Sequence, residues 1–306
     1  GERSISTPQH FAYLKISEGC NRTCSFCAIP LMRGEHISRT IESLVIEAKN
    51  LAKIGVKELI IIAQELTYYG LDLYKKRALD ELLFALNEVE GIEWIRLHYA
   101  YPSKFPLEIL DAINQCEKVC HYLDIPFQHA ADNVLKRMRR QVTRQEQTEL
   151  IQQIRAKVPN IVLRTTMLVG FPGETDADFE DLCNFVREMQ FERLGVFTYS
   201  HEENTIAHQY EDNISDEIKQ ERAQVLMSIQ EEISFAKNFE KIGQTYKVLI
   251  DRKESGNYIG RTEFDSPEVD NEVLIPTKGN YLRIGDFAQI KIVDATEFDL
   301  YGALVK

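Results

Sequence analysis

The chain has no long apolar run, few cysteines and too little positive charge, and each lack excludes a class of protein. No apolar stretch approaches the roughly 18–20 residues of a membrane-spanning helix, and no signal peptide is evident. We therefore expect a cytoplasmic protein. Six cysteines in 306 residues are too sparse for a disulfide scaffold. The net charge of −12 disfavours general binding to nucleic acid and favours a basic partner.

Short apolar runs alternate with helix-periodic segments from residue 11 to about 200, and this alternation predicts the first domain. The strand candidates are residues 11–17, 57–63, 94–99, 120–125, 161–169 and 193–199. Repeated strand–helix units indicate parallel strands joined by helical crossovers. Six units are too few for a closed eight-stranded barrel, so the pattern predicts an α/β fold with a partial, open six-unit β/α barrel.

The pattern changes near residue 241, which predicts a second domain. Residues 215–242 read as one long amphipathic helix. Five short β candidates, separated by turn residues, follow from Gly243 to the end. Five short strands in about 60 residues suggest a small OB-like barrel. We therefore expect one domain over residues 1–240 and a second over residues 241–306.

Half of the cysteines lie within eight positions, in the stretch EGCNRTCSFCAIPLMRG. Cys20, Cys24 and Cys27 have the spacing C-x3-C-x2-C and follow the first predicted strand. Soft thiolates in a tight loop suit an iron–sulfur cluster or zinc. A closed zinc site needs a fourth ligand, and His36 lacks a zinc-like spacing; three buried structural cysteines are a further alternative. A [4Fe-4S] cluster held by three thiolates leaves one iron open, which is typical of a catalytic metal site.

The cysteine spacing, with the aromatic Phe26 before the last cysteine and a partial α/β barrel around it, resembles the radical S-adenosylmethionine (SAM) superfamily. The resemblance implies that SAM chelates the open iron through its amino and carboxylate groups. One electron from the cluster, supplied by an electron donor, then splits SAM into methionine and a 5'-deoxyadenosyl radical. That radical abstracts hydrogen from an unactivated carbon.

Polar residues after the other predicted strands are candidates for holding SAM, although solvated strand ends and a solvated helix face are the plainer alternatives. Arg164 lies inside the fifth strand, where it needs a partner such as the SAM carboxylate or a structural ion pair. Gly170, in the turn VGFPGET, allows close approach of the backbone. The predicted SAM-binding residues are Phe26, Gln64, Glu65, Gln128, Arg140, Arg164 and Gly170.

The order of the motifs is similar to that of the radical SAM methylthiotransferases, which end in a TRAM domain. The matching stretches are YLKISEGCNRTCSFCAIPLMRG, DIPFQHAADNVLKRMRR, LVGFPGET and the five-stranded tail. Enzymes of this family modify either the β-carbon of an aspartate in ribosomal protein S-twelve of the small subunit, or an adenosine-derived base of tRNA. Residues 241–306 hold 9 Lys and Arg against 11 Asp and Glu. That acidic balance favours the basic ribosomal protein over RNA, and the segment GRTEFDSPEVDN (260–271) also resembles the ribosomal-protein enzymes.

One departure from the family lies at the amino terminus. Family members begin with a further domain whose cysteines bind a second [4Fe-4S] cluster implicated in sulfur transfer, whereas nineteen residues precede Cys20. We therefore expect a fragment without the sulfur-donor cluster, in which Cys116, Cys120 and Cys183 are packing residues. We also expect a monomer. The alternatives are a tRNA methylthiotransferase, another radical SAM enzyme, and a zinc-stabilised RNA-binding protein.

Overall fold

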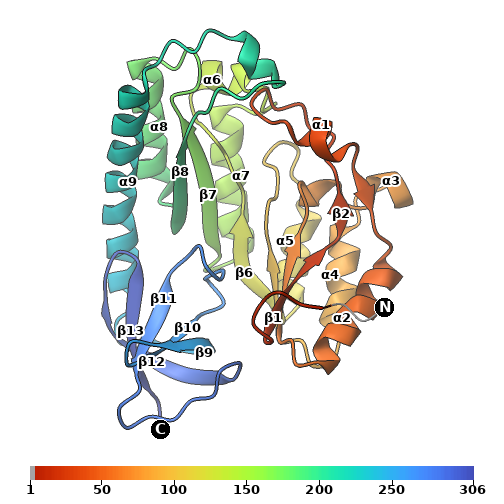
Figure 1. Ribbon diagram of the computed structural model, residues 1–306, viewed down its shortest axis with the longest axis vertical. Coiled ribbons are helices and arrows are strands. Elements are labelled where there is room, and N and C mark those ends of the chain that lie inside the picture. The colour runs from red at the N-terminus through yellow and green to blue at the C-terminus, as the bar shows by residue number, and fades with distance from the viewer. Residues whose placement is uncertain (1–3) are drawn as a thin grey trace.

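Six parallel strands form one open sheet in the computed structural model, which describes residues 4–306 (Figure 1). The strands lie side by side in chain order: β1 (Phe11–Lys15), β4 (Glu58–Ile62), β5 (Trp94–Leu97), β6 (Val119–Asp124), β7 (Val162–Val169) and β8 (Arg193–Thr198). The edge strands β1 and β8 do not pair with each other within the described residues. The predicted partial β/α barrel is therefore confirmed.

Helices between the strands cover the outer face of the sheet (Figure 1). The long ones are α2 (Ile41–Lys53), α4 (Leu79–Asn87), α5 (Glu108–Gln115), α7 (Arg144–Lys157), α8 (Asp176–Met189) and α9 (Asp216–Phe239). Both α7 and α8 begin with a capping box, which satisfies amide donors that a helix start leaves free. No helix of the described chain is long and apolar enough to cross a membrane.

Shorter elements complete the first domain at the end where the strands finish. They are β2 (Ser17–Glu18), α1 (Ile29–Arg33), β3 (Ile37–Ser38), α3 (Leu71–Tyr74), α6 (Asp132–Arg137), and 3-10 helices at Leu66–Tyr68 and Ile206–Gln209. Strands β2 and β3 pair antiparallel, and the cysteine loop lies between them in the sequence. These short elements shape the surroundings of the cysteine loop.

Alternation along the strands gives the sheet one apolar and one polar face. In β5, Ile95 and Leu97 belong to the core under the helices, whereas Arg96 between them points to the other face. In β6, Leu123 joins the same core, and the neighbouring Tyr122 does not. The inner face of the partial barrel is therefore lined with polar and aromatic side chains.

The second domain is a closed five-stranded barrel, as predicted. Its strands are β9 (Thr245–Glu254), β10 (Asn257–Arg261), β11 (Glu272–Pro276), β12 (Phe287–Ala295) and β13 (Asp299–Leu304), closed in the order β10-β11-β13-β12-β9. All pairings are antiparallel except β11 with β13. The long helix α9 ends at Phe239, six residues before β9 begins.

The small barrel packs against the amino ends of the sheet strands, at the opposite end of the molecule from α1 and α6 (Figure 1). Trp94 and Val162, the first residues of β5 and β7, share an apolar cluster with Leu249 and the partly buried Phe264 and Phe287. The rings of Trp94 and Phe287 are 4.9 Å apart, edge to face. The cysteine loop follows the carboxyl end of β1, so the two domains meet far from it.

Buried ion pairs join the domains beside this apolar cluster. Glu58, the first residue of β4, accepts from Arg96 at 2.8 Å and from Arg261 of the small barrel at 2.7 Å. Arg261 also donates to Asp251 at 2.6 Å. Burial opposes ionisation of Glu58, but the two guanidinium groups hold the pKa of its carboxyl below the usual range. All these charges are therefore paired, as buried charges must be.

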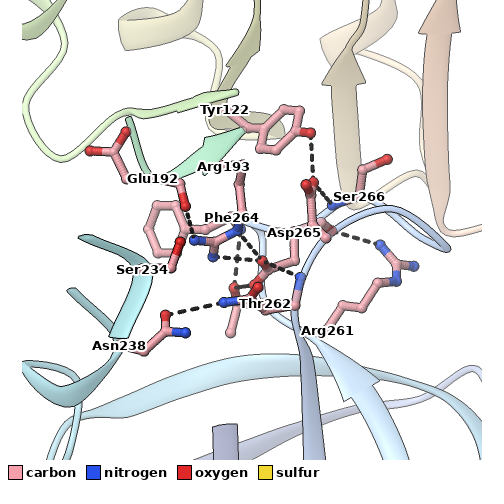
Figure 2. Close-up of polar contacts among 12 residues, drawn as sticks. Tyr122, Glu192, Arg193, Ser234, Asn238, Arg261, Thr262, Phe264, Asp265 and Ser266 are labelled. Atoms are coloured by element: carbon pink, nitrogen blue, oxygen red, sulfur yellow. Dashed lines mark hydrogen bonds and ion pairs between the residues drawn. The ribbon is translucent and has the colours of Figure 1, made fainter. Parts of the chain in front are cut away.

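The acidic segment 262–271 connects β10 to β11, and two of its acids lie between the domains. Asp265 is 1% exposed and accepts from Arg193 at 2.9 and 2.6 Å. Figure 2 shows these two side chains in contact between the domains. Tyr122 donates to the buried Asp270 at 2.6 Å. Both carboxylates are therefore used between the domains and are not free for a basic partner. Glu268 is the exposed acid of the segment.

Candidate active site

The cysteine loop is pinned in place by its own backbone. Gly19 has φ +78°, and a Cβ there would collide with the carbonyl oxygen of Glu35, so this position requires glycine. The Cys20 amide donates to the Gly34 carbonyl at 3.2 Å. The side-chain oxygen of Asn21 accepts from the His36 amide at 2.9 Å. The loop is thereby tied to the chain that follows α1.

Each of the three thiols receives a hydrogen-bond donor. The amide two residues further along donates to the sulfur of Cys20 at 3.4 Å and to that of Cys27 at 3.5 Å. Arg140 donates to the Cys24 sulfur at 3.3 Å, and the Tyr101 hydroxyl lies 3.4 Å from it. Such donors stabilise cysteine thiolates bound to iron. The side chains present therefore fit a three-cysteine cluster.

No group of three or more His, Cys, Asp or Glu side chains in residues 4–306 converges as around a single metal ion. The described side chains therefore form no closed site around one zinc ion. Burial raises the pKa of Cys20 to about 11, and it raises the pKa of Cys27 as well. Ligation would therefore release protons from these thiols.

Arg22 of the cysteine loop contacts residues that follow β4. The sequence pattern did not single it out. Its guanidinium lies between the rings of Tyr68 and Tyr101, at 4.2 and 3.9 Å from their centroids. It also pairs with Glu65 at 3.1 Å. The other Glu65 oxygen accepts from the Thr67 amide at 2.7 Å. Both carboxylate oxygens of the predicted SAM-binding Glu65 are therefore engaged by the protein.

The other predicted residues of this region lie at the same end of the sheet. Gln64 donates to Glu18 at 3.2 Å. Gln128 has φ +72°, and its backbone bridges to β7 through Thr166 and Leu168. Arg140 stacks on Tyr101, 4.3 Å from the ring centroid, besides its contact with the Cys24 sulfur. The fold therefore brings Arg140 directly to the cysteine loop.

Phe26 and Gly170 both pack within the protein. Phe26 is partly buried against a small cluster that includes Met138 and Phe171. Gly170 has φ +75°, and a Cβ there would collide with the Lys219 side chain of α9. Packing against α9 is therefore sufficient to explain the glycine, whatever ligand the turn holds.

Glu174 connects two loops that carry predicted SAM-binding residues, and only the structure identifies it. It is fully buried; one oxygen accepts from the Gly170 amide at 3.0 Å and from Arg222 at 2.7 Å. The other lies 2.6 Å from His129 Nε2. His129 Nδ1 accepts from the Ala131 amide at 3.1 Å, so Nε2 carries the proton and donates to Glu174. In the sequence, Glu174 is marked only by its place in the turn VGFPGET, directly after Gly173.

Arg164 is the third residue of β7 and lies beside Asp124, the last residue of β6. Its guanidinium donates to Asp270 at 3.0 Å and lies 3.8 Å from Asp124. Two carboxylates of the protein therefore already engage this guanidinium, and the predicted contact of Arg164 with the SAM carboxylate stays a prediction. The structural ion pair, which was the alternative prediction for an arginine inside a strand, is present in the fold.

Asp124 next to Arg164 gives a pH-dependent prediction. Burial raises the pKa of Asp124 from 3.8 to about 6, with Arg164 opposing the rise. The folded state therefore prefers the protonated acid. This preference stabilises the fold fully below pH 4, and the stabilisation is lost as the pH rises through about 6. Asp124→Asn removes the titration. From pH 4 to pH 7 the wild type should lose about 3 kcal/mol of unfolding free energy that the variant does not lose. Urea unfolding of both proteins at the two pH values measures this difference. A difference independent of pH would contradict the assignment.

Comparison with known proteins places the chain in a family. The model of the radical SAM superfamily matches residues 14–186, and that of the TRAM domain matches residues 242–305. Ribosomal protein uS12 methylthiotransferase RimO of Flavobacterium psychrophilum is 60% identical over 302 residues, 99% of this chain and 70% of the relative. The chain belongs to the RimO family. RimO of Cytophaga hutchinsonii is also 60% identical, over 100% of this chain and 70% of its own length.

Membership of the RimO family confirms the resemblance to the radical SAM methylthiotransferases. Among solved structures, coproporphyrinogen III oxidase (HemN) from Escherichia coli, a radical SAM enzyme, has a TM-score of 0.57 at 18% identity, over 75% of this chain and 54% of its own. Methylornithine synthase (PylB) has a TM-score of 0.52 at 15% identity, over 73% of this chain and 63% of its own. At such identities these structures support the fold alone.

Proposed function

We propose that this chain is the SAM-cleaving part of an enzyme that places a methylthio group on the β-carbon of an aspartate in ribosomal protein uS12. The substrate is supported by one observation above all: relatives 54–60% identical over nearly the whole chain are uS12 methylthiotransferases. Cys20, Cys24 and Cys27 would hold the [4Fe-4S] cluster, whose sulfurs receive the hydrogen bonds described above. When bound, that cluster supplies the electron that cleaves SAM.

The protein groups around the cluster have separate tasks in this proposal. Arg140 places a positive charge against the Cys24 sulfur and screens the negative charge that the thiolates bring. Gln64, Gln128 and the Gly170 turn, at the carboxyl ends of three strands, remain the proposed contacts of SAM. Phe26 and Glu65 support the loop from inside the protein. The proposed partners are uS12 and an electron donor.

The chain has no second place for a cluster among its described residues. Cys116, Cys120 and Cys183 are at most 2% exposed; Cys116 and Cys183 pack in the main core, whereas Cys120 belongs to the separate apolar cluster around Trp94. The first listed relatives are longer, since this chain covers about 70% of them. We therefore propose that the 306-residue chain cleaves SAM without transferring sulfur.

The substrate assay compares this chain with the full-length Flavobacterium psychrophilum relative, both reconstituted with iron and sulfide and reduced with dithionite. Each is given SAM and either a uS12 loop peptide containing the aspartate or isopentenylated tRNA. We expect methionine and 5'-deoxyadenosine from both proteins, and a methylthiolated peptide, detected by mass spectrometry, from the relative. Methylthiolated peptide from this chain alone, or product on the tRNA, would contradict the proposal.

A further inference from the structure

Arg222 of the long helix α9 contacts the turn at residues 169–175, which we call the glycine turn. Its side chain is nearly buried. One terminal nitrogen donates to Glu174 Oε1 at 2.7 Å and to the Glu174 carbonyl at 3.2 Å, and the other donates to Asp176 at 2.9 Å. The planar fork of a guanidinium can make such contacts together, which a single ammonium group cannot. Arg222 therefore holds both the side chain and the backbone of Glu174.

Glu174 in turn holds two segments at the carboxyl end of the sheet. Its Oε1 accepts from the Gly170 amide at 3.0 Å, and its Oε2 lies 2.6 Å from Nε2 of His129. Gly170 follows β7 directly, and His129 follows Gln128, whose backbone bridges to β7. One buried carboxylate therefore fixes both Gly170 and the neighbour of Gln128, and these two residues are among the proposed contacts of SAM.

Arg222 also supplies the positive charge that Glu174 needs. The Glu174 side chain is fully buried, and Arg222 is its cationic partner among residues 4–306, because His129 donates as a neutral ring. Lys219, a neighbouring cation of α9, pairs with Asp212 at 2.8 Å instead. Without Arg222 the buried carboxylate would be left unpaired, which is costly. The geometry of the glycine turn therefore depends on this guanidinium.

The glycine turn lies against the cysteine loop. The Ser25 hydroxyl donates to the carbonyl of Arg137 at 2.7 Å, and the Arg137 side chain donates to the carbonyl of Pro172 at 3.1 Å. Phe26 packs in the same small cluster as Phe171. Figure 1 shows α6, which carries Arg137, at the same end of the molecule as α1 and the start of α9. A small molecule bound at the open position of the cluster would therefore have the turn close to it.

We propose that Arg222 is a positioning residue for SAM, which acts through Glu174 and does not touch SAM itself. By fixing Glu174, it holds the Gly170 amide and the segment of Gln128 in the arrangement that SAM binds. The inference rests on the proposed function, because it requires SAM at the cluster. Loops that are held in place before a ligand arrives lower the cost of ordering them on binding.

Two other roles of Arg222 predict different results. A direct contact with SAM would need free guanidinium donors, whereas both terminal nitrogens are used inside the protein. A purely structural ion pair would change how much protein folds, and not how the folded protein binds SAM. Loss of folded protein lowers the apparent kcat and the bound iron together and leaves KM unchanged. The KM for SAM therefore separates positioning from stability.

The test is the rate of dithionite-driven SAM cleavage by the reconstituted chain, measured against the concentration of SAM. We expect Arg222→Met to raise the KM for SAM about tenfold, the lower end of the effect of residues that orient a ligand-holding group, with kcat and bound iron unchanged. Arg222→Lys keeps the charge without the fork, so its KM should lie between those of the wild type and Arg222→Met.

Arg187→Met is the matched control. Arg187 is an exposed arginine of α8 that lies 3.4 Å from Glu180. Exposed pairs of this kind contribute little, and Arg187 does not contact the glycine turn. Its replacement should therefore leave the KM for SAM at the wild-type value.

Glu174→Gln with Arg222→Met covers the case in which Arg222→Met alone does not fold. The double variant leaves no unpaired buried charge at this place, yet it lacks both the guanidinium fork and the carboxylate oxygen that accepts from His129. Its KM for SAM should therefore also rise about tenfold.

A wild-type KM in Arg222→Met or in the double variant would overturn the inference. So would a loss of kcat and bound iron at unchanged KM, which is the result expected of a structural pair. Absence of dithionite-driven cleavage in the wild type would instead overturn the proposed function.

Discussion

Replacing Cys20, Cys24 or Cys27 with alanine is expected to abolish the reductive cleavage of SAM. Two remaining thiolates do not hold a [4Fe-4S] cluster that needs three, so the loss should exceed the 10–100-fold effect of changing a residue around a metal ligand. The readouts are 5'-deoxyadenosine by chromatography, bound iron, and the visible absorbance of the reconstituted protein. All three should fall together in each variant.

Cys183→Ala is the matched control for the cysteine variants. Cys183 is 1% exposed and packs in the core between α8 and the sheet, away from the cysteine loop. Its replacement removes one thiol of the same chemistry and leaves a small cavity, so stability should fall modestly while iron content and cleavage stay intact. Normal iron and cleavage in any of the three loop variants, or their loss in Cys183→Ala, would contradict the assignment of the ligands.

Arg261→Met is expected to lower the free energy of unfolding by about 3–5 kcal/mol, because it breaks a buried ion pair and leaves its partners charged. Arg261 is 1% exposed and holds Glu58 of the sheet and Asp251 of the small barrel together. Urea unfolding measures the loss. Limited proteolysis of the connection between Phe239 and Thr245 should also become faster, because the domains are joined less firmly.

Arg252→Met is the control for this prediction. Arg252 lies in β9, pairs with two glutamates, and has a side chain 46% exposed to solvent. Exposed pairs contribute about 0–1 kcal/mol, so its replacement should be nearly neutral. Equal losses in the two variants would show that the buried pair does not join the domains as described.

The strands of both domains could be predicted because each carries its own pattern. The run at 57–63 became β4 (Glu58–Ile62), and the run at 193–199 became β8 (Arg193–Thr198). The short elements around the site, such as α1 and the β2–β3 pair, could not be predicted. They are too short to show a period, and they depend on contacts such as those of Ser38 with Asp72 of α3.

The residues of the candidate site likewise fall into those that the sequence predicts and those that it does not. Residues that act within one loop were readable, because the spacing of Cys20, Cys24 and Cys27 is itself the signal. Tyr101 at the Cys24 sulfur is 77 residues away in the sequence, and Arg222 at Glu174 is 48 residues away. Such partners meet only when strands and helices pack, so the pattern gave no sign of them.

By itself the sequence determined the cysteine loop, the parallel sheet and the small barrel, since local spacing and alternation specify each of them. Only the tertiary structure decided what the charged residues do. Arg164 pairs with Asp270, and Asp265 with Arg193, between the domains. Whether a charge meets a ligand, a partner protein or another charge depends on what the rest of the chain places beside it, because burial requires a partner.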